Sequence, residues 1–257
     1  MTEPAAPNRK GGRGAALVTG GAKRIGRAIC LDLAAAGFDV AIHHRASADD
    51  AARLADEIEA LGRRAVCLSA DLAELEATEA LIGQAVEALG PLSVLVNNAS
   101  VFADDRLDSL TGKSWAGHLD VNLRAPVLLA QAFAAQAPNG ASIINILDQR
   151  VLKPDPRFFS YGLSKSALWV ATRTMAQALA PRIRVNGVGP GPTLPSVHQT
   201  EADFAAEAAA TPLGRPASPG AVAAAVLWLV DAELVTGQMI AIDGGQHLAW
   251  QTPDIVE

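Results

Sequence analysis

The stretch ALVTGGAKRIGRA, residues 16–28, contains the transition that decides the fold. Its first part belongs to a short apolar run, residues 15–19, which ends at Gly20-Gly21. Such a run predicts a buried strand that breaks into a tight turn. Residues 24–36 follow with apolar side chains at helical spacing, and Gly37 predicts the end of that helix. The stretch is therefore interpreted as a strand, a glycine turn and a helix in immediate succession.

The same alternation continues along the chain. Further strands are predicted at residues 39–44, 64–68, 92–96, 142–147, 182–188 and 238–242. Helices are predicted at residues 48–61, 74–89, 112–136, 160–180, 201–210 and 219–230. Repeated strand–helix alternation with right-handed crossovers predicts an α/β fold: one Rossmann-type doubly wound domain, with a parallel seven-stranded sheet and helices on both faces.

The ends and one internal stretch of the chain depart from this alternation. Residues 1–13 are polar and contain Pro and Gly, so we expect a mobile tail ahead of a single domain at residues 14–257. Residues 189–218 are rich in Pro and Gly and exceed the usual loop length. Within them we expect residues 192–215 to form a substrate loop that closes over the site.

Composition excludes several classes of function. The chain has 257 residues and a formal net charge of −6, which argues against nucleic-acid binding because phosphates require a basic face. It has no apolar run long enough to span a membrane and no signal-peptide pattern, so a cytoplasmic location is expected. The two cysteines, Cys30 and Cys67, fit no disulfide or metal pattern and are expected to be buried and inert. No metal site is predicted.

The glycine turn predicts a dinucleotide site. Glycines let the backbone approach a pyrophosphate, and the helix N-terminus supplies free N–H groups. An NAD site usually has an acidic residue at the end of the second strand, but this strand ends His43-His44-Arg45-Ala46-Ser47. Arg45 and Ser47 would instead suit a 2′-phosphate, so NADP(H) is the expected cofactor. Asp71, after the third strand, is interpreted either as an acceptor for the adenine amino group or as a helix cap.

Several motifs occur in order at fitting strand ends: Thr19-Gly20-x-x-x-Arg24-x-Gly26, Asn97-Asn98-Ala99, Asn122, Tyr161-x-x-x-Lys165 and Pro190-Gly191. Over about residues 14–247, this order resembles the short-chain dehydrogenase/reductase family. The resemblance implies an NADP-binding reductase, usually a homotetramer, in which Asn122 holds a water of the proton relay. The cofactor contacts expected from the turn chemistry and the resemblance together are Gly20, Arg24, Ile25, Gly26, His44, Arg45, Ser47, Asp71, Leu72, Asn98, Ala99, Ser100, Tyr161, Lys165, Pro190 and Gly191.

The chemistry of the tyrosine and lysine also follows from the residues themselves. Tyr161 is the only tyrosine of the chain, so it is the one candidate for a phenol acid. Lys165 is four positions later and would share its helical face. A nearby ammonium stabilises a phenolate, so we expect Lys165 to lower the pKa of Tyr161 and make it a usable acid. A surface contact is the alternative interpretation of such a pair.

The chain departs from the family pattern 13 residues before the tyrosine, where most members carry a serine. Here the fifth strand reads INILD and ends at Asp148. An ionised carboxylate only accepts hydrogen bonds, so it would repel a developing oxyanion. Asp148 with Tyr161, and Asn97-Asn98-Ala99-Ser100 followed by Phe102, resemble the pteridine reductase branch. There the resemblance implies that Phe102 stacks on a pterin. A core aromatic for Phe102, and lineage drift or lost activity for Asp148, are the alternatives.

The function expected from these residues is NADPH-dependent reduction of a pterin-type C=N bond. Catalysis is assigned to Tyr161, Lys165, Asp148 and Asn122, and substrate binding to Arg24, Ser100, Phe102, Asp148 and Tyr161. Two other functions remain open: a ketone or 3-oxoacyl reductase of the same family, and a non-catalytic NADP-binding sensor. The partner is expected to be a small molecule, with no nucleic acid and no membrane.

Overall fold

The computed structural model describes residues 12–196 and 199–250. Nearly all of the predicted N-terminal tail therefore lies outside the described residues. The strands are β1 (Ala15–Val18), β2 (Asp39–His44), β3 (Ala65–Ser69), β4 (Leu92–Asn97), β5 (Ala141–Ile146), β6 (Ile183–Pro190) and β7 (Met239–Ile242). The α-helices are α1 (Arg24–Ala35), α2 (Ala48–Ala60), α3 (Leu75–Leu89), α4 (Gly112–Leu119), α5 (Ala125–Gln136), α6 (Phe159–Leu179), α7 (Glu201–Ala209) and α8 (Pro219–Asp231).

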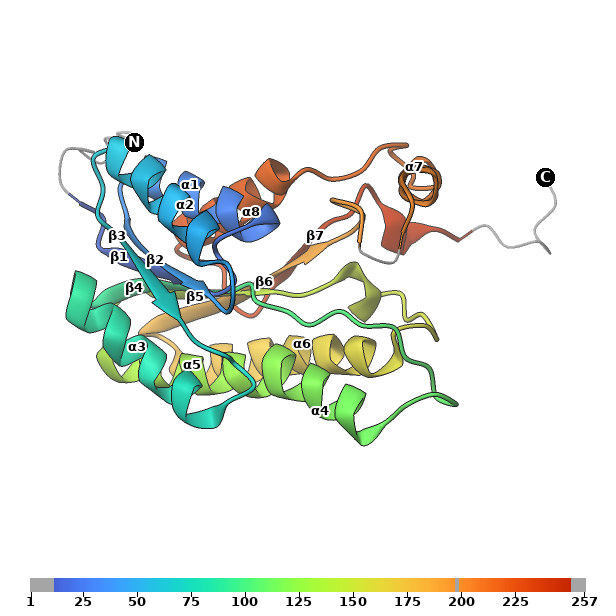
Figure 1. Cartoon of the computed structure of the whole chain (residues 1–257), viewed down its shortest axis with the longest axis horizontal. Helices are drawn as coiled ribbons and strands as arrows, with labels where there is room; N and C mark the ends of the chain where they lie inside the picture. Colours follow the sequence, from blue (N-terminus) through green and yellow to red (C-terminus); the bar gives the residue numbers. More distant parts are fainter. Residues whose placement is uncertain (1–11, 197–198, 251–257) are drawn as a thin grey trace.

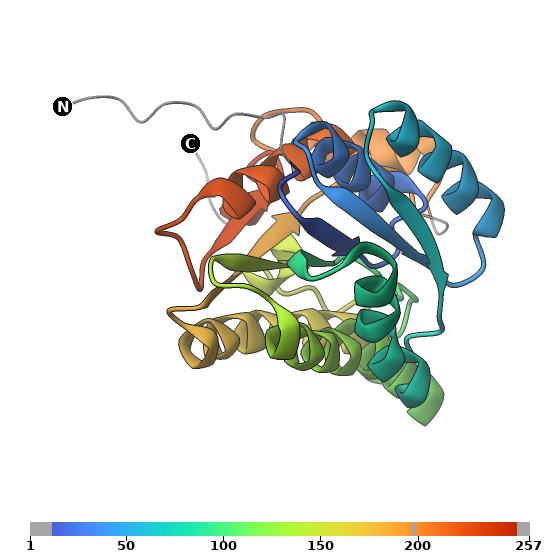
Figure 2. The same ribbon diagram turned by 90° about the vertical axis from the view of Figure 1, so that its left-hand side faces the viewer.

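The strands form one parallel sheet in the order β3-β2-β1-β4-β5-β6-β7. The order reverses between β1 and β4, which is the switch point where doubly wound folds bind ligands. Figure 1 shows α1, α2 and α8 on one face of the sheet and α3 to α6 on the other, and Figure 2 shows the same three layers from the side. The predicted fold class is thus confirmed, including all seven strands.

The layers are held together by two hydrophobic cores, one on each face of the sheet. Alternate residues of β1 point to opposite faces, so Ala16 and Val18 join the core under α1, α2 and α8, whereas Leu17 joins the core under α3, α5 and α6. Most strand residues are buried on both sides, which is why these strands are continuous apolar runs rather than alternating ones.

The long helix predicted at residues 112–136 is continuous but not uniform. Its middle, Asp120–Arg124, forms a π turn between α4 and α5. Pro126 lies in the first turn of α5 and has no N–H to donate to the carbonyl of Asn122 four positions earlier. The Ala125 N–H bonds instead to the carbonyl of Asp120, five positions earlier. The widened turn contains Asn122, and such π turns occur frequently at functional sites.

One expectation for the cysteines is wrong. Cys30 is fully buried, but Cys67 is exposed on β3, because β3 is an edge strand whose outer side has no neighbouring strand. Burial raises the pKa of the Cys30 thiol far above its ordinary value, as expected for an inert group. None of the helices in the described residues is both long and apolar enough to cross a membrane.

The close approach of α1 to the glycine turn gives the first testable prediction. A Cβ on Gly26 would lie 2.2 Å from the carbonyl oxygen of Gly20 and 2.7 Å from Nδ2 of Asn98. Gly26→Ala must therefore push α1 away from the sheet, and we expect a loss of about 2 kcal/mol or more of unfolding free energy. The measurement is chemical denaturation followed by circular dichroism.

Gly83→Ala is the matched control for that variant. Gly83 is exposed inside α3, and nothing lies within 4 Å of the position of its Cβ. Because alanine favours a helix interior over glycine, this variant should gain about 0.5–1 kcal/mol. Equal effects of the two substitutions would contradict the packing role of Gly26.

Candidate active site

Two adjoining cavities open at the carboxyl edge of the sheet. The larger has a volume of about 840 Å³ and the smaller about 390 Å³. Both are lined by Arg24, Ile25, Asn98 and Ser100, so they meet over the first turn of α1. The larger cavity lies between the ends of β5 and β6, α6 and the segment that includes α7. This is the edge at which the carboxyl ends of all seven parallel strands meet.

The glycine turn forms the floor between the two cavities. Gly20 has a φ of +60°, which favours glycine, and its N–H donates to Nδ1 of His43 at 3.0 Å. The Asn98 Nδ2 donates to the carbonyls of Thr19 and Gly20, at 2.9 and 3.0 Å. The Thr19 hydroxyl in turn accepts from the N–H groups of Asn98 and Ala99. These bonds tie the ends of β1 and β4 together at the switch point.

The structure brings most of the predicted cofactor residues to these cavities. The residues that line one cavity or both are Gly20, Arg24, Ile25, Gly26, Arg45, Asp71, Leu72, Asn98, Ala99, Ser100, Tyr161, Lys165, Pro190 and Gly191. His44 and Ser47 line neither. His44 is 7% exposed and points to the opposite face of β2 from His43. Ser47 lies at the N-terminus of α2.

His43 holds the position at the smaller cavity that the motif comparison assigned to His44. Its ring bridges the Gly20 N–H and the carbonyl of Ala70, the latter at 3.1 Å from Nε2. This arrangement requires a neutral ring with its proton on Nε2. Burial lowers the pKa of His43, which is consistent with that state. Because both faces of β2 are buried, the sequence pattern contains no signal that distinguishes the two histidines.

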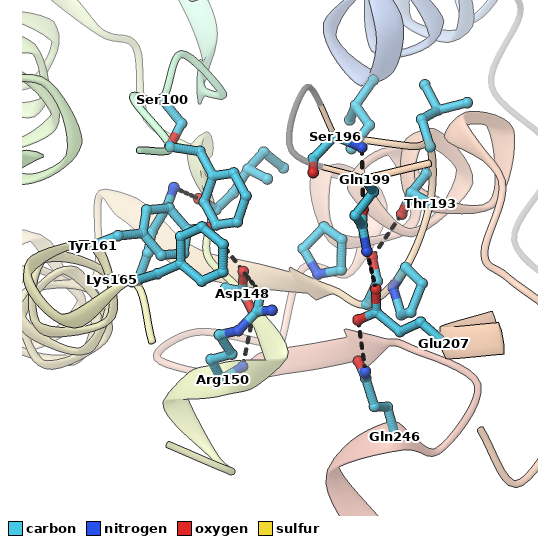
Figure 3. Close-up of a pocket in the computed structure, with 18 of the residues that line it drawn as sticks. Ser100, Asp148, Arg150, Tyr161, Lys165, Thr193, Ser196, Gln199, Glu207 and Gln246 are labelled. Carbon is cyan, nitrogen blue, oxygen red and sulfur yellow. Dashed lines mark hydrogen bonds and ion pairs between the residues drawn. The ribbon is translucent and has the colours of Figure 1, made fainter. Parts of the chain in front are cut away.

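Tyr161 and Asp148 make the central contact of the larger cavity. The Tyr161 hydroxyl donates to Oδ2 of Asp148 at 2.8 Å, as Figure 3 shows. Both residues are buried, Tyr161 to 6% exposure and Asp148 to 8%. Burial, and after it the neighbouring carboxylate of Asp148, raise the pKa of Tyr161 well above its ordinary value. The direction is opposite to the predicted lowering by Lys165, because burial disfavours the phenolate and the charge that contacts the phenol oxygen is the carboxylate of Asp148.

Lys165 lies on the same face of α6 as Tyr161, as its spacing predicts. Its ammonium is 5.8 Å from the centre of the Tyr161 ring, but it donates to the carbonyl of Ile146 at 2.8 Å rather than to the phenol. Burial lowers the pKa of Lys165 to about 8, and the charge of Asp148 opposes that effect. The head group of Lys165 is thus fixed at the end of β5.

Arg150 is a further charged residue of this wall. Nη1 of its guanidinium lies 3.3 Å from Oδ2 of Asp148. The backbone N–H of Arg150 donates to Oδ1 of the same carboxylate at 2.8 Å. Its guanidinium also lies over the rings of Phe102 and Phe158, 5.8 and 5.6 Å from their centres. Arg150 therefore neutralises the carboxylate on one side and covers aromatic surface on the other.

Phe102 and Phe158 form an aromatic wall. Their ring centres are 4.3 Å apart in a stacked arrangement, and the Tyr161 ring meets Phe102 edge-on at 4.8 Å. Phe158 has a φ of +53°, an unfavourable value for a bulky side chain. It immediately precedes α6, and its left-handed backbone takes it out of the helical repeat, so periodicity in the sequence could not have found it.

Asn122 is buried behind this wall and does not line either cavity. Its Oδ1 accepts from the Val101 N–H at 2.8 Å and the Ser100 hydroxyl at 3.2 Å. Its Nδ2 donates to the Val101 carbonyl and the Ser164 hydroxyl, at 3.0 and 3.1 Å. The side chain of Asn122 thus fastens the segment after β4 to α6.

The opposite wall of the larger cavity belongs to the predicted substrate loop and to α7 (Figure 3). Glu207 of α7 accepts hydrogen bonds from Nε2 of Gln199 at 2.6 Å and from Nε2 of Gln246 at 3.1 Å. Arg24 reaches the same loop, donating to the carbonyls of Leu194 and Pro195. The loop is therefore closed against the site. Residues 197–198, which include His198, lie outside the described residues.

Comparisons with known proteins agree with this geometry. The family model described as enoyl-(acyl carrier protein) reductase matches residues 20–247. The structure of FolM alternative dihydrofolate reductase 1 from Brucella canis, complexed with NADP, is 47% identical and superposes with a TM-score of 0.92, covering 96% of this chain and 99% of that one.

Two relatives found by sequence are more distant. An uncharacterized oxidoreductase of Mycobacterium tuberculosis is 37% identical over 239 residues, covering 90% of each chain. The 3-oxoacyl-[acyl-carrier-protein] reductase FabG of Staphylococcus aureus is 31% identical over 240 residues, covering 91% of this chain and 98% of that protein. With its Rossmann-type fold, the Tyr161–Lys165 pair at the carboxyl edge of the sheet and these matches over nearly its whole length, the chain belongs to the short-chain dehydrogenase/reductase family of oxidoreductases.

Proposed function

We propose that this enzyme is an NADPH-dependent reductase of a pterin-type C=N bond, such as that of a dihydropteridine or dihydrofolate. The observation that carries the proposal is the hydrogen bond from the Tyr161 hydroxyl to Asp148, at the position where the family resemblance implies a serine. The likeness to alternative dihydrofolate reductases from Brucella canis and Brucella suis, both solved with NADP, supports it.

The two cavities suit a dinucleotide in shape and chemistry. At the turn, glycine is required where Gly20 has a positive φ and where a Cβ on Gly26 would strike the backbone. The smaller cavity would hold the adenosine half, with Arg45 against the 2′-phosphate and Asp71 and Leu72 beside the base. The larger cavity would hold the nicotinamide half between Ile25, Lys165 and the Pro190–Gly191 turn.

Tyr161 would act as the proton donor. When bound, NADPH supplies the hydride that reduces the carbon of the C=N bond. The raised pKa of Tyr161 keeps the phenol protonated at neutral pH, so its proton is available for the adjacent ring nitrogen. Asp148 disfavours the resulting phenolate, and after taking up a proton from water it would return that proton to the phenolate through the same contact. Lys165 places a positive charge beside both groups.

The substrate would lie against the aromatic wall. A planar pterin would stack on the ring of Phe102, and its N–H groups would donate to Asp148, which only accepts hydrogen bonds as a carboxylate. Arg24 and Ser100, which line both cavities, would contact the polar edge of the substrate or the cofactor phosphates. A ketone oxygen would receive no hydrogen bond from Asp148, because a carboxylate cannot donate to a developing oxyanion.

Ketone or 3-oxoacyl reduction is the second candidate, and the similarity to the Staphylococcus aureus reductase favours it. A cofactor sensor without catalysis is not supported, because such a protein has no need for a buried Tyr161–Lys165 pair. Purified enzyme with NADPH, assayed against dihydropterins, dihydrofolate and a panel of ketones, distinguishes the three. Turnover of ketones without any pterin turnover would overturn the proposal.

The assembly and location of the enzyme stay predictions. Exposed apolar side chains on α4, α5 and α6, and on and after α8, would fit the interfaces of a homotetramer: Trp115, Val127, Leu163, Val170, Trp228 and Leu234. Sedimentation of the purified protein measures the oligomer. A cytoplasmic location rests on the sequence alone.

The acid role of Tyr161 is tested by Tyr161→Phe. Turnover should fall by about 10²-fold or more, because the variant keeps the ring and loses the proton. The NADPH dissociation constant, measured by fluorescence titration, should change little. Unchanged turnover would refute the assignment.

The role of Asp148 is tested by Asp148→Ser, which restores the residue that most relatives carry. Turnover of a dihydropterin should fall about tenfold or more, since one charge-assisted hydrogen bond is lost, and ketone turnover should rise. Steady-state kinetics with both substrates checks this. A parallel fall for both substrates would contradict a role in substrate choice.

Cofactor preference is tested by Arg45→Ala. The loss of one guanidinium–phosphate contact should weaken NADPH binding about tenfold or more and leave NADH binding nearly unchanged. Arg53→Ala is the control, because Arg53 is exposed on α2 and pairs only with Asp50 among the described contacts. Equal losses for the two cofactors would show that Arg45 does not read the 2′-phosphate.

The pH dependence of the reaction follows from Lys165. Its ammonium is present below a pKa of about 8 and is lost above it. We therefore expect kcat/KM to fall as pH rises through about 8, at saturating NADPH and constant ionic strength. A flat profile across that range would mean that the charge of Lys165 is not required.

A further inference from the structure

We propose that His118, acting with Asp105 and Ser160, is a positioning residue that sets the spacing between Phe102 and Tyr161, and so the width of the substrate slot. The inference rests on the proposed function, because it assumes that Phe102 is the stacking wall and Tyr161 the proton donor. His118, Asp105 and Ser160 are nearly inaccessible, with exposures of 0%, 4% and 0%, and none lines either cavity.

Two side chains form hydrogen bonds with the backbone of the residues immediately before and after Phe102. Asn122 bonds the N–H and the carbonyl of Val101, immediately before Phe102. His118 accepts the N–H of Ala103, immediately after Phe102, on Nε2 at 3.1 Å. His118 and Asn122 are one helical turn apart in the continuous α4–π segment. Two buried side chains of one helix therefore clamp the backbone on either side of the aromatic wall.

The other side of His118 is connected to the catalytic helix. Its Nδ1 lies 2.6 Å from the hydroxyl of Ser160, the residue before Tyr161. The Ser160 hydroxyl and N–H both donate to the carboxylate of Asp105, the N–H at 2.9 Å. The carbonyl of Asp105 also accepts the Phe159 N–H at 2.9 Å. The first turn of α6 is thus bonded to the same segment that carries Phe102.

The hydrogen bonds of this cluster determine the tautomer of His118. Burial raises the pKa of Asp105, but the hydrogen bonds from Ser160 and Ser114 outweigh burial and leave that pKa lowered, so Asp105 is a carboxylate and accepts. Ser160 has one hydroxyl proton, which it gives to Asp105, so it accepts from Nδ1–H of His118. Nε2 is then free of a proton and accepts from Ala103. Only a neutral His118 joins both segments.

The geometry relates this cluster directly to the reacting groups. The His118 ring lies edge-on to the Tyr161 ring, with centres 6.0 Å apart, and the Tyr161 ring lies edge-on to Phe102. A shift of Ala103 moves Phe102, and a shift of Ser160 moves Tyr161. Because His118 bonds both, it fixes the distance between the stacking surface and the phenol.

Two substitutions separate the halves of this link. His118→Asn keeps a donor near the position of Nδ1 for Ser160 but lacks the acceptor for Ala103. His118→Gln keeps an acceptor near the position of Nε2 for Ala103 but lacks the donor for Ser160. With NADPH and a dihydropterin, we expect His118→Asn mainly to raise KM and His118→Gln mainly to lower kcat, each by about tenfold, as for one lost buried hydrogen bond.

A second readout does not depend on turnover. Tyr161 is the only tyrosine, so protein labelled at the phenol carbon Cζ gives a single NMR resonance from it. His118→Gln and Ser160→Ala should shift that resonance, and Ser160→Thr, which keeps the hydroxyl, should restore it. Thr172→Val is the control: Thr172 lies on the same helix, remote from the cluster, and its hydroxyl accepts a buried hydrogen bond from Asn145 of β5. It should lower the melting temperature without moving the resonance or the kinetic constants.

The outcomes are distinct. If the wild-type enzyme reduces no dihydropterin, the proposed function fails, and the Tyr161 resonance still tests the link to His118. If the wild type is active and both His118 variants behave like Thr172→Val, losing only stability, the cluster is merely structural and this inference is overturned.

Discussion

All seven strands run parallel, so their carboxyl ends reach the same edge of the sheet, and the whole site depends on this constraint. It brings together groups separated by more than a hundred positions in the sequence, such as Arg24 and Tyr161. The bonds of Asn98 to the glycine turn close the edge at the switch point between β1 and β4. The edge therefore offers two joined cavities, and Tyr161, Asp148 and Lys165 all line the larger one.

A carboxylate in place of a serine reverses the electrostatics of that larger cavity. Asp148 accepts the Tyr161 proton in a hydrogen bond, raises the pKa of the phenol and is itself paired with Arg150. A serine could donate to a substrate oxygen, whereas a carboxylate requires a substrate that donates. The same residue therefore contributes to the raised pKa of the phenol, and it is the reason for proposing a substrate with N–H groups.

The sequence alone predicted the order of the strands and helices, because period and turn residues are local properties. It also predicted Tyr161, Lys165 and Asp148 as neighbours, since their spacing along β5 and α6 is fixed by family geometry. It did not predict that His43 rather than His44 lines the smaller cavity, which depends on which face of β2 is buried under which helix. The sequence also did not predict the contacts of Glu207 with Gln199 and Gln246. These contacts join segments whose relative placement is determined only in the folded chain.

The direction of the Tyr161 pKa is the most instructive disagreement. Spacing alone places an ammonium near the phenol, but the lysine head group is satisfied by the Ile146 carbonyl, and the nearest charge is negative. A pKa depends on which group reaches the titrating atom, not on which residues share a helical face. In the proposed reaction this arrangement would have a use: a phenol that holds its proton until hydride reaches the adjacent carbon would not lose it beforehand. The charge of Arg150, which lowers the pKa of Tyr161 against burial and Asp148, would limit the cost of the phenolate once the proton has been transferred.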